Sequence, residues 1–119
     1  MKMLTLAPLA FALSATLTLA DPPKIEKVTA IELGGEWRFD VTISHGDTGW
    51  DDYADGWRVL DMDGAELGMR VLHHPHVNEQ PFTRSLSGIS IPSSVKQVQI
   101  EARESVGGWS GAILTVPLP

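Results

Sequence analysis

Three of the four histidines in this 119-residue chain lie in one segment, "VLHHPHVNEQPF", residues 71–82. Pro75 disfavours the helical conformation at the residue before it, so we expect the segment to be extended there. Side chains two residues apart in an extended chain point the same way, so His74 and His76 can present two imidazoles to one ion. Imidazole is a ligand for Cu²⁺, Zn²⁺ and Ni²⁺. The segment therefore predicts a divalent transition-metal site with His74 and His76 as its main ligands.

Three further residues are candidates to complete such a site: His45, His73 and Asp47. His45 continues the apolar parity of residues 37–43, and His73 continues that of residues 67, 69 and 71. We therefore expect both of them to point toward the core, and His74 and His76 to point outward. The alternative is structural. In that case His45 and His73 are buried neutral imidazoles bonded to loop carbonyls, and the other two are exposed without a role.

Aromatic residues near these histidines suggest a different function. Trp50 and Trp109 lie in glycine-flanked segments, and Tyr53 follows Trp50 closely. Exposed aromatic faces can stack on sugar rings or anchor a protein partner. The alternative to metal binding is therefore an interaction module that recognises a cell-envelope protein or a glycan through Trp50, Tyr53 and Trp109.

Composition excludes several other classes of protein. The chain has no cysteine, which removes thiolate metal sites, cysteine nucleophiles and a disulfide framework. It has 9 basic and 15 acidic residues. An acidic surface repels phosphate backbones, so nucleic acid is not an expected partner. A Ser-His-Asp triad could be written from Ser85, His73 and Asp47, but no nucleophile elbow accompanies it. We expect a binding protein and not an enzyme.

The first twenty residues have the features of a secretory signal peptide. Lys2 is the basic start, residues 4–13 are apolar, and residues 18–20 form a small-x-small cleavage site. A retained membrane anchor fits less well, because polar residues interrupt the stretch and acidic Asp21 follows it. We expect cleavage after Ala20 and no membrane insertion afterwards. The mature protein would lie in the periplasm of a Gram-negative bacterium or be secreted. Without a cysteine, lipid attachment is not expected.

The mature chain, residues 21–119, predicts one all-β domain. Apolar and polar residues alternate with period two in residues 35–45, 55–61, 66–72 and 95–103. Residues 24–33, 82–89 and 112–119 supply three further strands, and Asp63-Gly64 is a hairpin turn signal. About seven short antiparallel strands with regular turns are typical of an immunoglobulin-like or fibronectin-type β-sandwich.

Placing these strands antiparallel in chain order brings the candidate residues together. Successive connections then alternate between the two ends of the sandwich. Tight turns gather at one end, and the segments 45–55, 73–81 and 103–111 gather at the other. Loops clustered at one end of a rigid sandwich are where this architecture places function. We therefore expect all four histidines, with Trp50, Tyr53 and Trp109, at a single end.

Three strings carry a resemblance to a known group of proteins: "SHGDTGWDDYADGW", "LHHPHVNEQPFTRSLSG" and "ARESVGG". They resemble a family of small secreted bacterial proteins of unknown function, and the resemblance covers most of the mature chain. It implies an exported protein and no particular activity. Members of the family can have histidine where this chain has Asp52, Arg103 and Gly107, so this chain has fewer imidazoles for a site.

Overall fold

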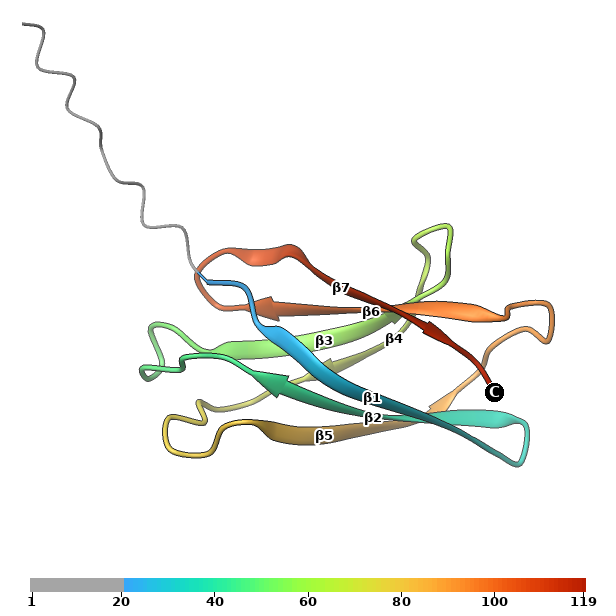
Figure 1. Cartoon of the computed structure of the whole chain (residues 1–119), viewed down its shortest axis with the longest axis horizontal. Coiled ribbons are helices and arrows are strands. Elements are labelled where there is room, and N and C mark those ends of the chain that lie inside the picture. Colours follow the sequence, from blue (N-terminus) through green and yellow to red (C-terminus); the bar gives the residue numbers. More distant parts are fainter. Residues whose placement is uncertain (1–20) are drawn as a thin grey trace, which may run out of the picture.

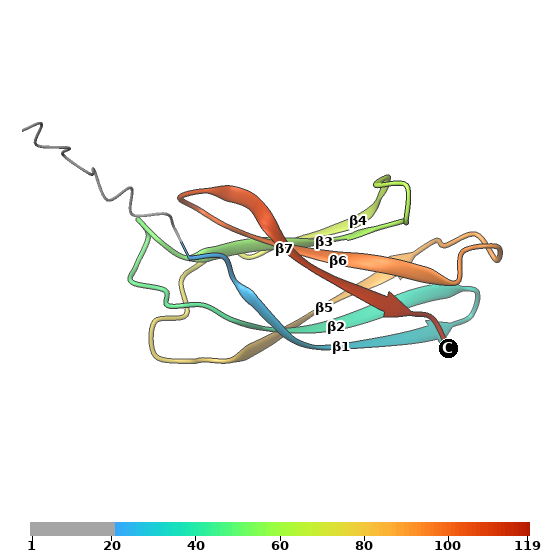
Figure 2. The ribbon, with the colours of Figure 1, turned by 45° about the horizontal axis from the view of Figure 1, so that its top comes forward.

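The computed structural model describes residues 21–119, and the expected signal peptide, residues 1–20, lies outside the described residues. Seven strands follow in order: β1 (Lys24–Leu33), β2 (Glu36–Ser44), β3 (Ala54–Leu60), β4 (Glu66–Val71), β5 (Phe82–Ile89), β6 (Gln97–Glu104) and β7 (Gly108–Pro117). All pair antiparallel, in sheets of order β1-β2-β5 and β4-β3-β6-β7. The predicted seven-stranded β-sandwich is confirmed, and Figure 2 shows the two sheets face to face. Within residues 21–119 no helix has the length and apolarity to cross a membrane.

The position of β4 distinguishes this sandwich from an immunoglobulin constant domain. In that domain the fourth strand pairs with the fifth, in the sheet that also holds the first two strands. Here β4 pairs with β3 in the other sheet. The connection from β4 to β5, residues 72–81, therefore crosses from one sheet to the other at the end of the sandwich. The connection from β2 to β3, residues 45–53, crosses beside it (Figure 1).

The core forms between the alternating faces that the sequence predicted. In β2 the side chains of Trp37, Phe39, Val41 and Ile43 are buried, and their polar neighbours in the strand are half-buried. They pack against Val98, Ile100 and Ala102 of β6 and against the fully buried Trp57 of β3. Removing these apolar surfaces from water is the main driving force for folding.

The prediction for the faces of β4 is confirmed for Leu67, which packs against the core, and is wrong for the two later positions. Met69 and Val71, expected to point inward, are exposed, and Leu72 is buried instead. Cross-strand partners share a face of the sheet, and Gly68 is opposite the fully buried Val59. A Cβ on Gly68 would lie 3.1–3.2 Å from side-chain atoms of Leu86 and Ile89 in β5, so a larger residue would need these side chains to shift by a few tenths of an ångström. A glycine on the core face leaves no apolar signal in the sequence.

The predicted clustering of loops at one end is confirmed (Figure 1). Loops 45–53, 72–81 and 105–107 meet at one end of the sandwich, which we call the histidine pole. The turns at residues 34–35, 61–65 and 90–96 lie at the opposite end. The third loop of the histidine pole is shorter than expected, because β6 continues to Glu104 and β7 begins at Gly108. Trp109 therefore lies in strand β7 and not in a loop.

Candidate functional site

Asp47 joins the two loops that cross between the sheets. Its buried Oδ1 accepts from Nδ1–H of His45 at 2.6 Å and from the backbone N–H of Ala54 at 2.9 Å. Its Oδ2 accepts from the backbone N–H of His76 at 2.8 Å. Gln80 adds a second link, because it accepts from the backbone N–H of His45 and donates to the carbonyl of His76. One carboxylate thus positions loop 45–53 against both β3 and loop 72–81.

The imidazole of His45 lies among oxygen atoms. Its Nδ1 bonds Asp47, and its Nε2 lies 3.0 Å from the carbonyl oxygen of Asp21 and 3.7 Å from Oδ1 of Asp52. A doubly protonated ring donates to both the carboxylate and the carbonyl. A ring protonated at Nδ1 alone cannot donate to the Asp21 carbonyl, and its Nε2 lone pair then faces the acceptor oxygens of Asp21 and Asp52, an arrangement that a cation between these atoms would stabilise. That second form, with Nδ1–H held by a carboxylate, is the form in which histidine binds metal ions.

Glu104 is fully buried at the end of β6 and closes the short β6–β7 turn. Its carboxylate accepts from the backbone N–H groups of Val106 and Gly107. Ser105 ties the same turn to loop 45–53, because its hydroxyl accepts from the backbone N–H of Tyr53 and its own N–H donates to the Tyr53 carbonyl. Each carboxylate oxygen of Glu104 keeps a second lone pair free for another partner.

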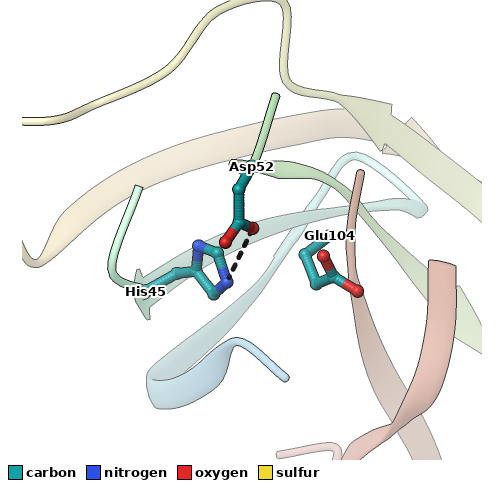
Figure 3. Close-up of side chains that lie close together, drawn as sticks. All are labelled: His45, Asp52 and Glu104. Carbon is teal, nitrogen blue, oxygen red and sulfur yellow. Dashed lines mark ion pairs between the residues drawn. The ribbon is translucent and has the colours of Figure 1, made fainter. Parts of the chain in front are cut away.

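His45, Asp52 and Glu104 together form a cluster that could hold a metal ion. Each offers one ligand atom, and the three atoms lie within 4.8 Å of one another. Figure 3 shows the side chains converging from the β2–β3 loop and from the end of β6. Two ligands about 2.1 Å from one tetrahedral Zn²⁺ lie roughly 3.4 Å apart. The 3.7 Å between His45 Nε2 and Asp52 Oδ1 therefore needs only a small adjustment.

The charges of the cluster also favour a cation. Ionised, the carboxylates of Asp47, Asp52 and Glu104 outnumber the single positive charge that His45 can carry. Backbone N–H groups already stabilise the buried carboxylates of Asp47 and Glu104, and a bound cation would balance the negative charge that remains. Oδ1 of Asp52 is buried and has no hydrogen-bond partner among residues 21–119. This oxygen is therefore available to a ligand.

His76 has a structural environment. Its ring stacks on Phe82, with centroids 3.9 Å apart and planes 13° from parallel. Arg84 donates from Nη2 to Nε2 of His76 at 2.8 Å. Because arginine can only donate, Nε2 is the acceptor and the ring proton sits on Nδ1. With its Nε2 lone pair occupied and a guanidinium beside it, His76 is poorly suited to bind a cation.

The other two histidines of the segment are exposed. His73 does not point into the core as expected. The ring centroids of His74 and His76 lie 4.7 Å apart, so the two side chains point the same way, as expected. The His76 ring is buried, however, and does not face outward as predicted. Among residues 21–119, no group of three close metal-binding side chains includes His73, His74 or His76. Of the five predicted ligands, the structure brings His45 and Asp47 into contact.

The environment of His76 predicts a pH-dependent contribution to stability. Burial lowers the pKa of His76 below its ordinary value of 6.5, and the positive charges of Arg84 and His74 lower this pKa further. In the unfolded chain the pKa of His76 returns to its ordinary value. Below about pH 6.5 the unfolded chain therefore binds a proton at His76 that the folded protein does not bind. The free energy of unfolding of the wild type should therefore fall as the pH drops from about 6.5 to 5.

Urea unfolding across this pH range, with and without His76→Gln, measures that contribution. The variant does not titrate at this position, so its stability should depend less steeply on pH than that of the wild type. His73→Gln, at an exposed neighbour, is the matched control and should keep the wild-type slope. Equal slopes in all three proteins would contradict the prediction.

The three aromatic residues of the alternative function do not form one cluster. The side chain of Trp50 is 68% exposed and packs edge-on against Tyr53, with ring centroids 5.7 Å apart. Trp109 lies under two guanidinium groups, at 4.0 Å from Arg58 and 5.4 Å from Arg103. The exposed Trp50 and the half-buried Tyr53 therefore form a pair, whereas Trp109 takes part in cation–π contacts of the β4-β3-β6-β7 sheet.

Sequence reasoning did not single out Asp52 and Glu104 as principal ligands. A signal for Glu104 was present, because it continues the buried parity of Val98, Ile100 and Ala102 in β6. An acidic residue on the apolar face at the end of a strand indicates a buried carboxylate with a specific partner. Asp52 lies in a loop with no period, and its approach to His45 depends on how that loop folds.

Comparison with known proteins gives one informative likeness. A protein named "Putative lipoprotein" from the archaeon Halomicrobium mukohataei is 38% identical to this chain over 90 residues. The matching segment covers 75% of this chain and 44% of that protein, so the chain spans less than half the length of this relative. No family model matches the chain, and no solved structure matches it.

Proposed function

We propose that this protein binds a divalent transition-metal ion at the histidine pole, and that it is a binding protein and not a catalyst. The ligands are Nε2 of His45 and carboxylate oxygens of Asp52 and Glu104. The observation that supports this proposal is the close approach of one imidazole and two carboxylates, all within 4.8 Å of one another. Asp47 orients His45 by accepting its Nδ1–H, which is the usual role of a carboxylate behind a metal-bound histidine.

The donor set limits the choice of ion. One imidazole nitrogen with carboxylate oxygens suits Zn²⁺, which accepts both ligand types and has no electronic preference for one geometry. Cu²⁺ and Ni²⁺ also bind imidazole, and Cu²⁺ generally binds a given nitrogen and oxygen site more tightly than Zn²⁺ does. We therefore propose Zn²⁺, Cu²⁺ or Ni²⁺, with Cu²⁺ the most sensitive probe in solution.

We also propose that the protein is exported. The signal-peptide features of residues 1–20 support this, and so does the name of the archaeal relative, a lipoprotein. We propose further that the protein lies in the periplasm of a Gram-negative bacterium and belongs to the family of small secreted proteins noted above. The name of the archaeal relative does not itself support these two points. A metal-binding domain of this size in the envelope would store or deliver its ion.

Asp52→Asn tests the metal site with little disturbance of the fold. The Asp52 side chain is partly exposed and its Oδ1 has no protein hydrogen bond, whereas the Asp52 backbone groups pair within their own loop. An amide of the same shape is a much weaker ligand. We expect the affinity for Zn²⁺ and Cu²⁺, measured by competition titration, to fall at least about tenfold.

Asp51→Asn is the matched control, because Asp51 is the exposed neighbour in the same loop and has no place in the cluster. It should bind metal as the wild type does. Unfolding in the presence of a chelator should show similar stabilities for the wild type and both variants. Wild-type protein that binds no more tightly than Asp52→Asn would overturn the proposed function.

A second candidate function rests on the exposed Trp50 and its partner Tyr53. Trp50 lies in the same loop as Asp52, at the histidine pole of the sandwich (Figure 1). We propose that this pair contacts a cell-envelope protein or a glycan. In this candidate function the histidines only support the loops.

A further inference from the structure

We propose that the α-amino group of Asp21, once freed by removal of the leader, is an additional ligand of the metal ion at His45. Leader removal would then complete the site. This inference rests on the metal-binding function proposed above and on cleavage after Ala20. It identifies a nitrogen ligand that exists only in the processed protein.

The first observation is the position of Asp21. Its carbonyl oxygen lies 3.0 Å from Nε2 of His45, the nitrogen that also faces Asp52. Sheet pairing sets this position, because Lys24, at the start of β1, is the partner of Ser44, the residue before His45. Pro22 and the buried Pro23 restrict the short connection between Asp21 and β1. Asp21 is thus directed toward the cluster by the chain that follows it.

The second observation is chemical. The α-nitrogen of a residue is joined to its carbonyl oxygen through three covalent bonds, so the two atoms stay within roughly 3.7 Å and can close a five-membered chelate ring on one ion. In an unprocessed chain this nitrogen is part of an amide, and its lone pair is delocalised into the peptide bond. In the processed chain it is an amine with an ordinary pKa of about 7.7–8.0. It releases its proton to solvent when it binds the metal.

The two prolines make this ligand distinguishable from ordinary copper binding at a chain terminus. Cu²⁺ commonly recruits the deprotonated amide nitrogens that follow a free terminus. Pro22 and Pro23 have no backbone N–H, so no such nitrogen exists here. The ion must therefore complete its coordination from the amine, the Asp21 carbonyl and the side chains of the cluster.

The experiment compares mature protein beginning at Asp21 with the same protein acetylated at its α-amine, each as wild type and as Asp52→Asn. Cu²⁺ affinity is measured by competition titration, and the nitrogen ligands are counted from the superhyperfine splitting of the Cu²⁺ EPR spectrum. We expect acetylation to weaken binding by the wild type at least about tenfold and to reduce the nitrogen count from two to one. Acetylation should also weaken binding by Asp52→Asn, because the amine, His45 and Glu104 remain as ligands in that variant.

The outcomes separate this inference from the function on which it rests. Equal affinity of free and acetylated wild type, with both weakened by Asp52→Asn, overturns the role of the amine and leaves the metal site intact. Wild type that binds Cu²⁺ no better than Asp52→Asn overturns both. An intact mass of the exported protein that places its first residue elsewhere than Asp21 overturns the inference directly. Urea unfolding in the presence of a chelator compares the stability of the free and the acetylated wild type, and equal midpoints would show that acetylation leaves the fold unchanged. If the midpoints differ while the Cu²⁺ affinities are equal, the result counts against the inference.

Discussion

Replacing Asp47 by alanine is expected to lower the free energy of unfolding by about 3–5 kcal/mol. The substitution removes the buried acceptor of three donors: Nδ1–H of His45 and the backbone N–H groups of Ala54 and His76. Each buried donor left without a partner costs about 1–3 kcal/mol, although water entering the space would recover part of this loss. Urea unfolding in the presence of a chelator measures the effect without any contribution from bound metal.

The neighbouring Asp51→Ala is the control for this prediction. Asp51 is exposed in the same loop, and its loss should change the stability by less than about 0.5 kcal/mol. Asp47→Asn should lower the free energy of unfolding by an intermediate amount. Its amide keeps one acceptor oxygen but places an NH2 donor against another donor. If Asp47→Ala costs less than about 1 kcal/mol, Asp47 does not hold the two crossing loops together in the way its contacts indicate.

Metal binding should raise the melting temperature of the mature protein strongly. A ligand that binds only the folded state at one hundred times its Kd adds about 2.7 kcal/mol of stability. In a domain of about 100 residues, each 1 kcal/mol shifts the melting temperature by roughly 4–8 °C. We therefore expect saturating Zn²⁺ to raise it by about 10 °C or more, an effect that thermal unfolding followed by circular dichroism would detect and that a chelator would reverse.

Two variants define the origin of this shift. Asp52→Asn should lose at least about half of it, as a tenfold loss of affinity implies, and His74→Ala should keep it, because His74 is exposed and lies outside the cluster. The reverse pattern would place the metal at the segment 73–76, as the spacing of the histidines alone suggests. A shift retained in both variants would point to unspecific binding at the acidic surface.

Much of the architecture was predictable because it depends on local alternation. Residues 37–43 alternate strictly, and this pattern requires a strand with one buried face whatever its partners are. Four alternating segments, three less regular strands and short turns leave few arrangements other than a sandwich, and antiparallel order in the chain then places loops 45–53 and 72–81 at one end. His45 and Asp47 were found for the same reason, since each lies just beyond a strand with a clear pattern.

The ligand set was less predictable because it depends on contacts between segments distant in the chain. His45 and Glu104 are 59 positions apart (104 − 45) and meet only because β3 pairs with β6 and loop 45–53 folds over the end of β6. The inward position of His76 depends on how loop 72–81 folds against β5, where the His76 ring stacks on Phe82 and Arg84 donates to its Nε2. Alternation also assigned Met69 and Val71 to the wrong face of β4, because Gly68, opposite the buried Val59, contributes nothing to a hydrophobic pattern.

By itself, the sequence determined that residues 21–119 form a β-sandwich with the histidines at one end, because period-two patterning and turn residues act over a few neighbouring positions. Only the tertiary structure decided which of those residues form a cluster. Sheet register brings Asp21 to His45, and the folding of loop 72–81 against β5 stacks His76 on Phe82 beside Arg84. Distances across loops depend on the packing of whole sheets, and no local pattern records them.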